Sequence, residues 1–231
     1  MSEQSLGKKA IWGMALFYVI AIALRYLTNK VGLASGISIS FLKVIVQALG
    51  PALGALVAVK VFRLDFVMTV KGVFRTIWTP LLVFWLLPVV LIAGNAYLRD
   101  RTFPWLAVCS ILVYGLLEEI GWRGFLQEQL KSLPRFRGIA IITVLWFVWH
   151  LNFKISSGNL VFLLILLLGS WGLNLVAHRT RSLLAVAAFH SLNNFYPEWD
   201  QTTAMMAGIM ACVWIGVLIY MKKTMPVSEQ S

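Results

Sequence analysis

The stretch VYGLLEEIGWRGFL, residues 113–126, places Glu118, Glu119 and Arg123 inside a run that is otherwise suited to lipid. Each charge near the centre of a membrane helix costs about 2.5–3.5 kcal/mol, while each Leu or Phe returns only about 0.3–0.6 kcal/mol. Pairing is therefore expected, and the i, i+4 spacing of Glu119 and Arg123, with the acid first, favours an ion pair on one face. Glu118 lies about 100° around the helix from Glu119 and requires a partner elsewhere.

The composition is that of an integral membrane protein. Of 231 residues, 60% are hydrophobic and 13% are charged, with a mean hydropathy of +0.82, whereas soluble domains average about 45–50% apolar and about 25% charged residues. The net charge of +11 comes from bases that fall mostly in short clusters between apolar runs, so we expect no nucleic-acid partner. Cys109 and Cys212 both lie in apolar runs and provide neither a disulfide framework nor a CxxC metal site.

The apolar segments predict an all-α polytopic protein. A bilayer core about 30 Å thick needs roughly 20 apolar residues at 1.5 Å each. No repeat, soluble domain or cleaved signal peptide is apparent, so residues 1–231 are expected to form a single membrane domain. The eight predicted spans are residues 10–27, 40–61, 77–97, 103–129, 138–152, 159–177, 182–196 and 202–221.

The basic residues predict the orientation. The N-terminus and the segments after the second, fourth, sixth and eighth spans hold most of the Lys and Arg residues, whereas the opposite loops hold only Lys30, Arg99, Arg101 and Lys154. By the positive-inside rule both termini face the cytoplasm. We therefore expect a multi-pass protein of the cell membrane, in contact with membrane lipid.

Four polar side chains are predicted to lie at similar depth on three helices. Counted from the cytoplasmic end of each span, Glu118 lies roughly 15 Å deep, His150 roughly 18 Å and His190 roughly 14 Å. Asn194 lies one turn deeper than His190 on the same face. Ionisable groups that converge inside a membrane usually mark a functional site, although a structural ion pair alone would account for Glu119 and Arg123.

These four side chains are sufficient for amide hydrolysis. A carboxylate and a histidine can hold a water and remove its proton, while a second histidine and an Asn amide can stabilise the oxyanion. Ser191 adjoins His190, which leaves a serine nucleophile open. Glu118, His150 and His190 also have the composition of a His₂Glu zinc site, although there is no HExxH. No cofactor is assigned, and zinc stays open as an alternative.

Several motifs resemble the CAAX protease and bacteriocin-processing family, also called Abi, which includes the type II CAAX prenyl endopeptidases. EEIGWRGFL, from Glu118, resembles its EExxxR motif, and HSLNN, from His190, resembles its last motif. WFVWH resembles its second motif, with Trp146 where phenylalanine is common. RTRSLL, from Arg179, resembles an RTGSL-like lead-in, with Arg181 in place of the usual glycine.

The resemblance, which covers a catalytic core at residues 103–196, implies a conical bundle of about eight helices that acts as an intramembrane endopeptidase, with a cavity open toward the cytoplasmic side. It implies that Glu118 and His150 activate water, that His190 and Asn194 form the oxyanion hole, and that Glu119 and Arg123 order the site. The family is often labelled metalloprotease, while its structural picture favours water activation without metal. The implied substrate is a peptide or a lipidated protein; the oligomeric state is not implied.

Two other functions stay open at this point. A bacteriocin-immunity or scaffold protein of the same fold would bind a peptide without cleaving it, although a binder does not need the complete Glu/His/His/Asn set. A small transporter could use the same buried carboxylates, although carriers often contain repeats that are not found here.

Overall fold

The computed structural model describes residues 6–103, 105–191 and 201–224. Regular structure in these ranges is helical, which confirms the all-α prediction, and their one isolated β-bridge pairs Thr69 with Ser182. In chain order the elements are α1 (Lys8–Asn29), α2 (Ser40–Phe62), α3 (Phe74–Leu81), η1 (Leu82–Leu86), η2 (Val89–Ala93), α4 (Gly94–Asp100), α5 (Trp105–Glu119), η3 (Ile120–Leu126), α6 (Gln127–Gln129), α7 (Arg135–Trp149), α8 (Ser157–Thr180), α9 (Leu183–Ser191) and α10 (Gln201–Thr224).

Four helical segments in the described ranges are long and apolar enough to cross a membrane. They are Lys8–Asn29, Ser40–Phe62, Trp105–Gln129 and Ser157–Thr180, and they correspond to the first, second, fourth and sixth predicted spans. The chain is therefore a helical membrane protein, and the count of eight spans stays a prediction.

Three of the other predicted spans correspond to helices that are shorter or interrupted in the described ranges, and the eighth corresponds to the 24-residue α10. The third is divided among α3, η1, η2 and α4, and it contains Pro80 and Pro88, each of which removes a backbone N–H from the helical hydrogen-bond ladder. The fifth corresponds to the 15-residue α7, and the seventh begins as the nine-residue α9.

The chain forms two compact units. Unit 1 consists of Met1–Met68 and Leu117–Asn174, and unit 2 of Thr69–Leu116 and Leu175–Ser231. Helices α5 and α8 each begin in one unit and end in the other.

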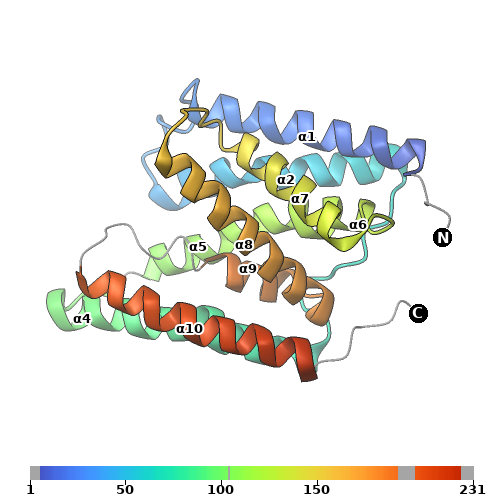
Figure 1. Ribbon diagram of the computed structural model, residues 1–231. Helices are drawn as coiled ribbons and strands as arrows, with labels where there is room; N and C mark the ends of the chain where they lie inside the picture. The colour runs from blue at the N-terminus through green and yellow to red at the C-terminus, as the bar shows by residue number, and fades with distance from the viewer. Residues whose placement is uncertain (1–5, 104, 192–200, 225–231) are drawn as a thin grey trace. The chain divides into compact units, whose positions relative to one another are not determined.

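In unit 1, α1 and α2 lie side by side (Figure 1) because two glycines allow their backbones to approach. A Cβ at Gly50 would lie 2.8 Å from the Ala21 carbonyl oxygen, and one at Gly54 only 2.6 Å from that of Phe17. The spacing of the glycines is the GxxxG pattern of closely packed membrane helices. Helix α7 is bound to α1 by the Trp149 indole, which donates to the Ala21 carbonyl at 3.0 Å.

In unit 2, the RTRSLL segment forms the entry to α9. Ser182 caps this helix, since its Oγ accepts from the Ala185 N–H at 3.1 Å, and its hydroxyl donates to the Val70 carbonyl at 2.9 Å. Arg181, which stands where the resembling motif has glycine, has a φ of 49°. A left-handed backbone favours glycine, which explains the preference for glycine at this position of the motif.

Gly54→Ala is expected to reduce the free energy of unfolding by about 1–3 kcal/mol, because the added methyl would overlap the Phe17 carbonyl. Gly169→Ala in α8 is the matched control, since a Cβ there meets nothing within 4 Å, and alanine favours a helix by up to about 1 kcal/mol. Denaturant unfolding in detergent measures both. Equal stability of the two variants would contradict the close approach of α1 and α2.

Arg181→Gly is expected to stabilise the protein by about 1 kcal/mol, because glycine adopts the left-handed conformation without strain. This corresponds to a rise of about 2–4 °C in Tm for a chain of this size. Arg181→Ala also removes the charge but keeps the strain, so its Tm should not rise. A thermal melt in detergent compares the three proteins, and the same Tm for both variants would contradict the strained entry to α9.

Candidate catalytic site

The charged motif lies where the α-helix α5 passes into the π-helical turns of η3. Glu118 and Glu119 end α5, and Arg123 lies within η3. Their exposed fractions are 1%, 0% and 1%. A π-helical segment inside a longer helix is rare and is frequently found at functional sites. Three ionisable side chains are thus buried at one irregular point of a membrane-length helix.

The ion pair predicted from the spacing is present in unit 1. Arg123 Nη1 donates to Glu119 Oε1 at 2.9 Å, and Arg123 Nη2 donates to Ser170 Oγ of α8 at 3.1 Å. The guanidinium also lies 4.6 Å from the centroid of the Trp146 ring, a cation–π distance. Arg123 therefore has a carboxylate, a hydroxyl and an aromatic face as partners, which offsets its removal from water.

Glu118 has Trp146 of α7 as a hydrogen-bond partner: the indole Nε1 donates to Glu118 Oε2 at 2.9 Å. In the sequence, Trp146 stands out only as a variant of an aromatic motif position, which gives no sign of a role for its N–H. Trp146 precedes His150 by one helical turn, so the two share a face of α7. That spacing is the signal that could have identified it.

His150 follows the last residue of α7, and its ring is oriented by the same residue that binds Glu118. Its Nδ1 lies 2.7 Å from the Trp146 carbonyl oxygen. Because a carbonyl only accepts, Nδ1 carries the proton in the neutral ring, and Nε2 is the basic nitrogen. The ring meets Trp149 and Phe162 edge to face, with centroids 5.2 and 4.8 Å away. The backbone of α7 and two aromatic rings thus fix the orientation of the His150 ring.

In unit 2, His190 lies near the end of α9 and is 4% exposed. The His190 ring packs edge to face against the Tyr114 ring, with centroids 6.3 Å apart. A Cβ added at Gly115 would lie 3.5 Å from the Cβ of His190. Ser191 is fully buried and its hydroxyl donates to the Ala187 carbonyl at 2.7 Å. This bond uses the proton that a serine nucleophile would have to give to a base.

Unit 1 therefore brings together Glu118, Glu119, Arg123 and His150 around Trp146. His190 lies in unit 2, and Asn194 lies outside the described residues, so convergence of all four predicted catalytic side chains stays a prediction. Of the predicted zinc ligands, Glu118 and His150 lie in unit 1 and His190 lies in unit 2, and in the part of the chain that the structure describes no group of three His, Cys, Asp or Glu side chains is placed to hold a metal ion.

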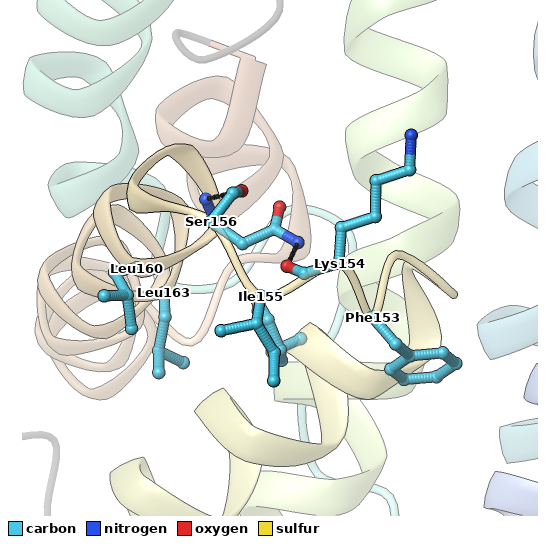
Figure 2. A pocket seen from close by; sticks show the side chains of 8 residues that line it. Phe153, Lys154, Ile155, Ser156, Leu160 and Leu163 are labelled. Carbon is cyan, nitrogen blue, oxygen red and sulfur yellow. Dashed lines mark hydrogen bonds between the residues drawn. The ribbon is translucent and has the colours of Figure 1, made fainter.

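Unit 1 also contains an apolar pocket of about 230 Å³, at the turn from α7 into α8. Figure 2 shows Ile155, Leu160 and Leu163 gathered there, beside the hydrogen bond from Asn159 to the Lys154 carbonyl. Phe147 also lines it, with its ring centroid 6.0 Å from that of Phe162. The pocket lining contains neither of the two glutamates nor His150, so the pocket is distinct from the polar site.

The described residues define a helical membrane protein in which a buried carboxylate and an imidazole each bond to Trp146. Residues 100–196 match the family model described as type II CAAX prenyl endopeptidase Rce1-like. The match confirms the resemblance for this segment, which is similar to the type II CAAX prenyl endopeptidases. A comparison with curated proteins gives no match.

Glu119→Ala is expected to reduce the free energy of unfolding by about 3–5 kcal/mol, because Arg123 stays buried without its carboxylate. A double replacement by Leu and Met should recover most of this loss, since apolar side chains often replace a buried ion pair at little cost. Denaturant unfolding in detergent measures both.

Glu128→Ala is the matched control, because it breaks an i, i+3 pair with Lys131 in which the lysine side chain is 46% exposed. Its effect should stay within about 1 kcal/mol. If Glu119→Ala were as mild as Glu128→Ala, the Arg123 pair would not be needed for the fold.

Proposed function

We propose that the protein is an intramembrane endopeptidase that hydrolyses a peptide bond with a water activated by Glu118 and His150. The observation that carries this proposal is the arrangement at Trp146, where a buried carboxylate and a histidine with a basic Nε2 are oriented by one residue. A structural ion pair needs neither Glu118 nor His150, so these two side chains argue for catalysis. The family of residues 100–196 supports the same activity.

In the proposed reaction, Glu118 takes a proton from a water that His150 helps to position, and the hydroxide attacks the carbonyl carbon. His190 and Asn194 donate hydrogen bonds to the resulting oxyanion. When the C–N bond breaks, Glu118 returns the proton to the leaving amine. The products are a new carboxylate, one of whose oxygens comes from water, and a new amine.

The substrate we propose is a peptide or lipidated protein that reaches the site from the membrane. We also propose the full count of eight spans, a cell-membrane location and cytoplasmic termini. The clusters of Lys and Arg at the ends of alternate predicted spans support this orientation.

Glu118→Gln and His150→Ala should each abolish cleavage, because each removes a group that handles the proton of water. Asn194→Ala should reduce the rate roughly 100-fold, the usual effect of losing one oxyanion donor. The measurement is quantitative mapping of peptide termini in host membranes and medium, in cells with wild type or each variant at matched protein levels. Termini that require wild type, and that purified protein reproduces, would identify the substrate.

Ser191→Ala is the control, because the proposal gives its hydroxyl no chemical step. Identical termini with wild type and Glu118→Gln, together with a phenotype on deleting the gene, would replace catalysis with a binding or immunity role. Cleavage that a chelator stops and zinc restores would require a metal in the mechanism.

A further inference from the structure

We infer that Trp146 is a positioning residue whose indole N–H fixes the orientation of the Glu118 carboxylate for water activation. The inference rests on the proposed function, which it deepens by assigning a role to a residue outside the four predicted catalytic groups. Trp146 does not handle the proton itself: an indole N–H only donates a hydrogen bond. Its effect on the reaction would pass through Glu118.

The geometry of Trp146 separates its side chain from its backbone. The indole Nε1 donates to Glu118 Oε2 at 2.9 Å, whereas the Trp146 carbonyl accepts from His150 Nδ1 at 2.7 Å. Replacing the side chain therefore removes the bond to the carboxylate and leaves a carbonyl for the histidine. The two groups proposed to activate water can be perturbed one at a time.

Both ends of the bond from Trp146 to Glu118 are shielded from water. Trp146 is 2% exposed and Glu118 is 1% exposed, and hydrogen bonds to a charged group are stronger than neutral ones. The Arg123 guanidinium, 4.6 Å from the Trp146 ring centroid, restrains the plane of the indole.

Two neighbouring tryptophans distinguish this role from ordinary core packing. Trp122 and Trp149 are as deeply buried as Trp146. The Trp149 N–H donates to a backbone carbonyl of α1, and the Trp122 N–H has no partner among the described residues. Of these three indoles, Trp146 is the one bonded to a carboxylate.

The resembling motif commonly has phenylalanine where this chain has Trp146. Phenylalanine would supply an aromatic side chain at this position but could not donate to Glu118. Trp146→Phe therefore removes the N–H and keeps an aromatic side chain that the motif accepts.

Trp146→Phe should lower kcat at least about tenfold, the effect of losing a hydrogen bond to a charged group. KM should stay within about twofold, because substrate binding does not use this N–H. Trp122→Phe is the matched control: it removes an equally buried indole without a hydrogen bond, and should leave kcat unchanged. The assay uses purified full-length protein and a peptide spanning the mapped cleavage site.

A kcat for Trp146→Phe equal to wild type, with Glu118→Gln inactive, would overturn the positioning role and leave the proposed function intact. An active Glu118→Gln would instead overturn the proposed function. The two failures are thus distinguishable.

Nuclear magnetic resonance of the indole N–H groups tests the hydrogen bond from Trp146 to Glu118 directly. It needs no activity assay, and it does not depend on whether the Trp146→Phe variant folds. The chain has 10 tryptophans, and Glu118→Ala should move one indole signal strongly upfield through loss of its carboxylate acceptor. Glu128→Ala, at an exposed pair, should move none. If Glu118→Ala also leaves every indole signal in place, the inference is overturned.

Discussion

Burial of the Arg123 guanidinium is the constraint on which the polar site depends. A charge removed from water must be compensated within the protein, and here Glu119, Ser170 and the face of Trp146 provide that compensation. These partners come from the same helix, from α8 and from α7 respectively. One cation therefore fixes how three helical segments of unit 1 meet, and the carboxylate of Glu118 is held within that arrangement.

Trp146 contacts both the buried Arg123 and the two side chains proposed to activate water. Its ring accepts the cation, its N–H orients Glu118, and its carbonyl sets the tautomer of His150. A site built in this way is preorganised, since the carboxylate and the imidazole are oriented before substrate arrives. The irregular turns of η3 place Arg123 at this point of the helix, and the match of residues 100–196 to a protease family is consistent with a catalytic use.

Much of this arrangement could be predicted from sequence, because it follows from spacing and hydropathy. Four of the predicted spans and the Glu119–Arg123 pair are confirmed. The bond from Trp146 to Glu118 could not be read in this way, because hydropathy treats an indole as apolar and gives no weight to its donor. The 15-residue length of α7 equals that of the fifth predicted span, residues 138–152, which begins three residues later. The strain at Arg181 comes from its left-handed backbone conformation. The only indication of it in the sequence is that arginine stands where the resembling motif has glycine.

The central claim is that activated water, and no side-chain nucleophile, attacks the peptide carbonyl. The most direct test incubates purified wild type with a peptide spanning the mapped site, in ¹⁸O-water containing hydroxylamine, and identifies the products by mass spectrometry. Direct attack by water predicts a new carboxylate that carries ¹⁸O and no hydroxamate. A peptide hydroxamate that disappears in Ser191→Ala would show an acyl-enzyme intermediate and contradict the account.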